Sequence, residues 1–322
     1  MTTFSRRTFL QFSGAATAAS LLPLRVQAAD SKVVRIGYQK SSTLIALLKA
    51  DGTLEKKLKP LGFEVSWNEF TSGLPLLEAL NIGSIDFSAD VADTVPVFAL
   101  AAGAKLVYVA QEAPSPKAQA ILVPTDSPIR TVADLKGKKI AVTKAAGSHY
   151  LLISALNKAG LSFKDITPAY LTPADGRAAF ERGAVDAWVT WDPFVAAAQR
   201  QTQVRVIADG SNGVADYQRY YLASSAFADA QPKLVNLIYA ELQHTGKWVK
   251  DNPEKAAAIL APIWGLDTAT VTAANARRSY EVRPVVPTAL REQQKIADTF
   301  YEAGLLPKPV SVFDAVVWKP QA

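Results

Sequence analysis

Short runs of β-branched or aromatic residues alternate with longer segments of helical periodicity, and this alternation restricts the fold more than any other feature of the chain. It is typical of βαβ units built around a mostly parallel sheet. The first series predicts four strands, at residues 33–38, 63–70, 85–89 and 106–111. Helices are predicted between these strands, at residues 43–58, 74–80 and 94–102.

A second series follows the Pro- and Ser-rich stretch at residues 113–116. It predicts further strands, at residues 120–123, 140–142, 166–171, 185–190 and 204–208. Helices are predicted near residues 150–158, 174–182 and 194–201. Residues 209–213 are typical of a loop. A strand is predicted at 217–223, and from there to about residue 303 the pattern is purely helical.

The two series predict two lobes of α/β structure, each a sheet flanked by helices, with a ligand cleft between them. Lobe one would contain residues 29–115 and 213–322, and lobe two residues 116–212. The chain would then cross between the lobes twice, and two crossings make a hinge that can close around a ligand. Two sequential domains are the alternative arrangement.

The N-terminus has the features of an export signal. Residues 5–10 read Ser-Arg-Arg-Thr-Phe-Leu, which is a twin-arginine signature. Residues 8–24 carry no charge, and the small residues around Val26-Gln27-Ala28 suit signal cleavage. An anchor helix is the alternative, but a membrane span needs about 20 apolar residues. We therefore expect residues 1–28 to be a removable twin-arginine signal peptide.

Composition excludes several classes of protein. The chain has no cysteine, so disulfides, thiolate metal sites and a lipid-modified cysteine at the cleavage site are all excluded. The formal net charge is +6, and the signal peptide accounts for three of those charges. A nucleic-acid binder would show a stronger basic stripe. We expect a soluble periplasmic protein that needs no cofactor and binds no nucleic acid.

Four predicted helices begin just beyond the carboxyl end of a strand. Their first residues are Thr71-Ser72-Gly73, Ala92-Asp93-Thr94, Gly147-Ser148-His149 and Trp191-Asp192-Pro193. Ordinary N-capping explains Ser and Asp at such positions. A second interpretation is functional, because ligands of open α/β sheets bind at this edge and helix N-termini attract anions. Facing lobes would then bind an anion without any buried Lys or Arg.

Other residues favour binding over catalysis. The sequence has only two histidines, His149 and His244, and neither a Gly-x-Ser-x-Gly motif nor a phosphate loop. His149 is the local group expected to titrate between pH 6 and 8. Strand alternation puts Trp188 and Trp191 on opposite faces. One of them is expected in the core, and Trp191 would be either a second core residue or a wall of the cleft.

Several segments resemble the aliphatic sulfonate-binding proteins of ABC importers, within the nitrate, sulfonate and taurine binding family. The most specific segments are Gly-Tyr-Gln-Lys at residues 37–40 and Asp-Ala-Trp-Val-Thr-Trp-Asp-Pro at residues 186–193. Residues 70–80, 133–139, 170–175 and 297–300 extend the likeness over the mature chain. One departure is Ala145-Ala146, where the family has Gly-Ser.

The resemblance implies a type II periplasmic binding fold and a cleft that holds the ligand's sulfonate. The implied ligand-binding residues are Gln39, Ser72, Gly73, Asp93, Thr94, Gly147, Ser148, His149 and Trp191. It also implies a monomer that delivers alkanesulfonates to a membrane permease and its ATPase for sulfur acquisition. The alternatives are taurine, nitrate or another small anion, and an exported enzyme similar to thiamine-pyrimidine synthases.

Overall fold

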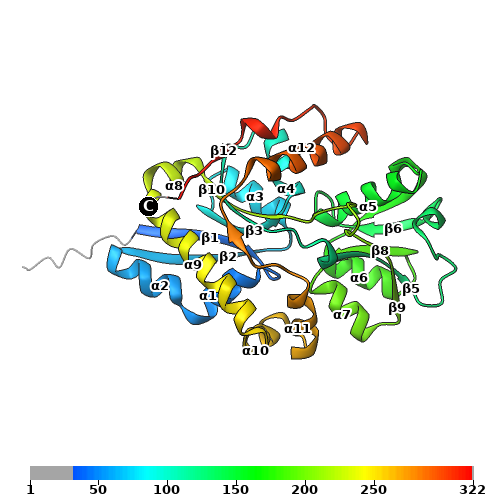
Figure 1. Cartoon of the computed structure of the whole chain (residues 1–322), viewed down its shortest axis with the longest axis horizontal. Coiled ribbons are helices and arrows are strands. Elements are labelled where there is room, and N and C mark those ends of the chain that lie inside the picture. Colours follow the sequence, from blue (N-terminus) through cyan, green and yellow to red (C-terminus); the bar gives the residue numbers. More distant parts are fainter. Residues whose placement is uncertain (1–31, 321–322) are drawn as a thin grey trace, which may run out of the picture. The chain divides into compact units, whose positions relative to one another are not determined.

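The computed structural model describes residues 32–320, and the predicted signal peptide lies outside this range. The first sheet has seven strands in the order β11-β4-β10-β3-β1-β2, with β12 also paired to β4. Strands β1, β2, β3, β10 and β12 are labelled in Figure 1. The strands are β1 (Lys32–Gln39), β2 (Phe63–Phe70), β3 (Phe87–Ala92), β4 (Leu106–Glu112), β10 (Arg219–Ser224), β11 (Val282–Arg283) and β12 (Val316–Val317). Strand β1 runs parallel to β2 and β3, whereas β10 runs antiparallel to β3 and β4.

The second sheet has five strands in the order β7-β6-β8-β5-β9. The strands are β5 (Gln119–Pro124), β6 (Lys139–Val142), β7 (Thr167–Tyr170), β8 (Ala187–Trp191) and β9 (Val204–Asp209). Strand β6 runs parallel to β7 and β8, but β5 runs antiparallel to β8 and β9. Each sheet is therefore mixed, because β5 and β10, the strands that follow each crossing of the chain, run against their neighbours.

The chain passes from the first sheet to the second between β4 and β5, and it returns between β9 and β10. This gives the two sheets flanked by helices that the sequence predicts. The residue limits proposed for the two lobes stay a prediction. Core packing also crosses between the sheets, since Val97, Ile153 and Phe300, from three different helices, belong to one buried cluster.

Helices cover both sheets. Their bounds are α1 (Thr43–Asp51), α2 (Thr53–Leu58), α3 (Gly73–Asn81), α4 (Thr94–Ala101), α5 (Gly147–Lys158), α6 (Pro173–Glu181), α7 (Phe194–Gln201), α8 (Ser225–Ala230), α9 (Pro232–Asp251), α10 (Pro253–Trp264), α11 (Thr268–Ala276) and α12 (Pro287–Glu302). Within residues 32–320 no single helix is long and apolar enough to span a membrane, although the bent pair α10 and α11 passes that test together.

Two elements differ from the prediction. The helix predicted at residues 43–58 is divided at Gly52, whose φ of 61° ends α1 in a left-handed turn. The segment predicted as purely helical to residue 303 contains β11, in which Val282 pairs with Glu112 of β4. A two-residue strand leaves no alternating pattern in the sequence, so periodicity alone misses it.

Candidate ligand-binding site

A small cavity lies where β1, β3 and β8 end and where α3 and α5 begin. Four of the predicted site residues line it, namely Gln39, Gly73, Gly147 and Trp191. The other lining residues are Ala92, Val95, Ala146, Tyr217 and Arg219. Only about 10 Å³ is open to the centre of a water molecule, which is about the room that one water needs. The lobes are therefore closed on each other at this point.

Glycine is required at both helix starts that border the cavity. A Cβ at Gly73 would lie 2.8 Å from Cγ2 of Val95, and one at Gly147 would lie 2.5 Å from the ring of Tyr217. Both separations are shorter than real Cβ contacts. The two glycines let the backbones of α3 and α5, with their unpaired N–H groups, approach one point from both lobes.

Arg219 brings a positive charge to the cavity. Its side chain is 3% exposed and donates to the Asp90 carboxylate and, at 2.7 Å, to the hydroxyl of Tyr217. Over residues 32–320 its Nε has no hydrogen-bond partner. The expectation of an anion site without a buried cation was therefore wrong, because β10 carries this arginine into the cavity wall.

A second arginine completes a buried ionic cluster. Arg278 donates to both oxygens of Glu112 at 2.8 Å and to Asp90 at 3.1 Å. Burial and the neighbouring Arg278 disfavour the charge on Arg219, but Tyr217, Asp90 and Glu112 outweigh them and raise its pKa. Two arginines thus share two carboxylates, and the cluster has no net charge before a ligand binds.

The side chains at the starts of α3 and α4 do not make the caps that the sequence suggests. Ser72 and Asp93 make no side-chain cap to α3 and α4. Asp93 instead accepts from the N–H of Gln218 at 2.9 Å, and burial raises its pKa to about 7. Thr94 donates its hydroxyl to the carbonyl of Ala145 at 2.7 Å, which ties α4 to the turn before α5.

The start of α5 is buried. Ser148 and His149 are both 0% exposed, and within the described range the Ser148 hydroxyl and the His149 Nε2 have no partner. Nδ1 of His149 accepts from the N–H of Ala145 at 3.3 Å. Burial, with a smaller effect of Lys144, lowers the pKa of His149 to about 3. The expected titration between pH 6 and 8 was therefore wrong, since rings of Phe163, Tyr170 and Phe300 surround the imidazole.

The two tryptophans separate as alternation predicts. Trp188 is a core residue, and Trp191 lines the cavity and packs edge-on against Phe194. The next residue, Asp192, accepts from the N–H of Ala196 at 3.0 Å and from Nε and Nη2 of Arg277 at 2.7 and 2.9 Å. Asp192 thereby links β8 to the end of α11.

Five predicted site residues do not line the cavity: Ser72, Asp93, Thr94, Ser148 and His149. Their contact with a ligand stays a prediction. Sequence reasoning missed Arg219 and Tyr217. Residues 217–222 read Tyr-Gln-Arg-Tyr-Tyr-Leu, with one charged residue in a segment predicted as a strand. A cation in a buried strand needs a partner, and this pattern could have marked Arg219 as a candidate site residue.

The geometry describes a two-lobed α/β protein with a small cavity between the lobes, which Gln39, Tyr217 and Arg219 line together with mostly apolar residues. Residues 59–256 match the family described as NMT1/THI5 like, and the chain belongs to this family. Residues 3–23 match the signal sequence of the twin-arginine translocation pathway, which confirms the predicted export signal.

Two relatives are similar to this chain over most of its length. A protein of Escherichia coli (strain K12) named for binding aliphatic sulfonates is 43% identical over 290 residues, which are 90% of this chain and 89% of the relative. A solved structure is that of the alkanesulfonate-binding protein SsuA from Xanthomonas axonopodis pv. citri bound to MOPS. It is 41% identical to this chain, with a TM-score of 0.84, and the match covers 90% of this chain and 99% of the solved chain.

The solved structure of the periplasmic aliphatic sulphonate binding protein SsuA from Escherichia coli is 43% identical, with a TM-score of 0.80. The match covers 90% of this chain and 93% of the solved chain. These comparisons confirm the two-lobed fold class and the resemblance seen in the sequence.

The turn before α5 generates a stability prediction. Ala145 has a φ of 61°, whereas Ala146 is extended with φ −78° and ψ 162°. A left-handed backbone costs a residue with a Cβ about 1–2 kcal/mol. Ala145→Gly and Ala146→Gly each remove one buried methyl group, and each increases the conformational entropy of the unfolded chain by the same amount. These two effects therefore cancel when the variants are compared. We expect Ala145→Gly to be the more stable variant by about 1–2 kcal/mol in urea unfolding. Equal stabilities would contradict strain at Ala145.

Burial of His149 generates a pH prediction. The unfolded chain protonates this histidine near pH 6.5, whereas the folded protein resists protonation until about pH 3. The unfolded state therefore binds one more proton between these values. This histidine lowers the free energy of unfolding by about 1.4 kcal/mol for each pH unit as the pH falls through that window. Urea unfolding of the wild type and His149→Phe, between about pH 4 and 8, should show this difference in slope.

Asp93 and Asp192 have raised pKa values, so their effect on the free energy of unfolding is the opposite: it increases that free energy as the pH falls. They are present in both proteins, so the difference between the two curves isolates His149. Parallel curves would show that the imidazole takes up its proton in the folded state.

Proposed function

We propose that this protein is the periplasmic substrate-binding component of an ABC importer, and that it captures alkanesulfonates for sulfur acquisition. The observation that carries the proposal is the buried Arg219, whose Nε is unpaired over residues 32–320 and which lines a cavity bordered by two helix starts. A guanidinium N–H and helix N-terminal amides together suit a sulfonate, which stays anionic at every physiological pH. The names of the relatives supply the ligand class.

Five of the lining residues have a role in this proposal. Arg219 donates through Nε to the sulfonate, and the backbone amides beside Gly73 and Gly147 donate from the two lobes. Gln39 holds the strand ends together, because its side-chain amide donates to the carbonyl of Asp90 at 3.1 Å. Trp191 contacts the first carbons of the tail. The protein works as a monomer that passes its ligand to a permease and ATPase and performs no chemistry on it.

The cavity favours sulfonates over the alternative anions. Nitrate and sulfate have no tail and gain nothing from the indole of Trp191. Taurine carries an ammonium group and needs a nearby carboxylate. The carboxylate closest to Trp191 in sequence is Asp192, which is already paired with Arg277. Taurine is therefore expected to bind more weakly than a simple sulfonate of similar length.

Calorimetry with ethanesulfonate, butanesulfonate, taurine, nitrate and sulfate tests the assignment. Arg219→Met should weaken sulfonate binding by about tenfold or more, since a hydrogen bond to a charged group contributes about 1.5–3 kcal/mol. Arg291→Met, which changes an exposed arginine on α12, should bind as the wild type does. Circular dichroism checks that each variant is folded.

Gly147→Ala provides a second route to the same site if Arg219→Met does not fold. Its added methyl group meets the ring of Tyr217, so it should also weaken binding of every sulfonate. The assignment fails if nitrate or taurine binds most tightly, or if a folded Arg219→Met protein retains full sulfonate affinity.

A further inference from the structure

Helix α12 is fixed to the first sheet near its beginning. The buried side chain of Gln293 accepts from the hydroxyl of Tyr108 on β4 at 3.0 Å and donates to the carbonyl of Asp93 at 2.7 Å. One turn earlier, the carbonyl of Ala289 accepts from the hydroxyl of Tyr220 on β10 at 3.3 Å. Because these partners belong to two strands of the first sheet and to the start of α4, the first two turns of α12 move with that sheet.

The last turn of α12 packs against α5, a helix that covers strands β5 and β8 of the second sheet. The ring of Phe300 is fully buried, and its centroid lies 5.0 Å from that of His149 and 6.4 Å from that of Tyr150. Both of these residues belong to the start of α5, and Ile153, one turn further along, is in the same buried cluster as Phe300. Helix α12 therefore reaches from one lobe to the other.

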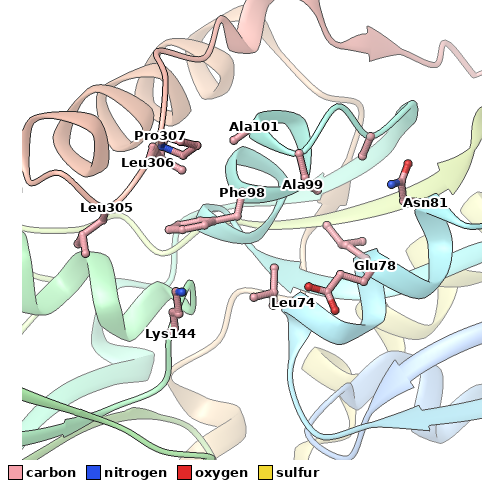
Figure 2. Close-up of a pocket in the computed structure, with 13 residues that line it drawn as sticks. Leu74, Glu78, Asn81, Phe98, Ala99, Ala101, Lys144, Leu305, Leu306 and Pro307 are labelled. Carbon is pink, nitrogen blue, oxygen red and sulfur yellow. The ribbon is translucent and has the colours of Figure 1, made fainter.

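A ring on α4 completes this contact. Phe98 lies edge-on to Phe300, with the ring centroids 4.9 Å apart and the planes at 78°. Edge-on pairs are a favoured arrangement of aromatic rings, and each pair stabilises the packing beyond its buried area. Figure 2 shows the open side of this junction, where Phe98 of α4, Leu305 after α12 and Lys144 before α5 border one groove. Phe300 thus joins α5 of the second sheet to α4 of the first.

The turn of α5 that Phe300 contacts also forms part of the cavity wall. His149 comes two residues after Gly147, which lines the cavity. The N–H of His149 donates at 2.9 Å to the carbonyl of Ala146, another lining residue. Phe300 itself does not line the cavity. Its ring contacts therefore hold the start of α5 against the first lobe without touching a ligand, and separation of the lobes must break them.

We propose that α12 is a clamp between the lobes, and that Phe300 is a positioning residue that holds the first turn of α5 at the cavity. The contacts of the clamp join the two lobes, so they form as the lobes close around a ligand. The clamp therefore slows the release of a ligand and leaves the rate of its first encounter unchanged. The clamp itself stands without any ligand, whereas its effect on release rests on the proposed function.

Small-angle scattering of the ligand-free protein tests the clamp itself. Phe300→Leu keeps an apolar side chain but removes the ring, so it should shift the lobes toward an open form and increase the radius of gyration. Phe87→Leu is the matched control, because Phe87 is also fully buried but lies on β3, in the core around the first sheet. This control should have the radius of the wild type.

The release of butanesulfonate tests the positioning role. Tryptophan fluorescence follows binding in a stopped-flow experiment, because Trp191 lines the cavity. Phe300→Leu should release butanesulfonate about tenfold faster than the wild type, since both ring pairs that cross between the lobes are lost. The association rate should change by less than about twofold. Phe87→Leu should match the wild type in both rates.

Tyr150→Leu removes a ring of the same contact from the other lobe and should have the same two effects, which keeps the test open if Phe300→Leu does not fold. The clamp is wrong if folded Phe300→Leu or Tyr150→Leu protein has the radius of the Phe87→Leu control. A larger radius with an unchanged release rate would overturn the positioning role of Phe300. If the wild type binds no butanesulfonate, the proposed function fails, and the radius of gyration still decides whether the clamp exists.

Discussion

The candidate site depends on a buried ionic cluster made by Arg219, Arg278, Asp90 and Glu112. Burying one unpaired charge costs several kcal/mol, so all four groups must be present together. The cluster joins β3, β4 and β10 to the second residue after α11, and these segments come from different parts of the sequence. It also holds the guanidinium of Arg219 at the cavity wall, where Nε has no hydrogen-bond partner among residues 32–320. Stability and binding thus share the same residues.

Contacts on two sides of the cavity hold the closed arrangement around this cluster. Thr94 bonds the carbonyl of Ala145 on one side, and Arg277 holds Asp192 on the other. Burial raises the pKa of Asp192 to about 6, although Arg277 opposes the shift. A buried apolar cluster that includes Val97, Ile153 and Phe300 also packs between the two lobes. At Gly73 and Gly147 the backbones of α3 and α5 come close to their neighbours and complete the wall of the cavity.

The sequence predicts most of the architecture, because period-two and helical patterns extend over many residues in both sheets. It also predicts Gly73 and Gly147 at the cavity, from their place at helix starts. It does not predict that β10 turns Arg219 inward, because pairing with Asp90 depends on strands more than 120 residues apart. The ordinary pKa expected for His149 was wrong for a similar reason, since the ring of Phe300, which packs against it, is far away in the sequence.

The proposed function depends on binding of the anion by Arg219 and the two helix starts. A crystal structure of the protein grown with butanesulfonate tests it most directly, because anomalous scattering locates the ligand's sulfur. We predict a sulfonate oxygen at about 2.7–2.9 Å from Nε of Arg219, the distance of a charge-assisted hydrogen bond, with further bonds from the amides beside Gly73 and Gly147. A sulfonate bound elsewhere, with Nε of Arg219 facing only water, would contradict the account.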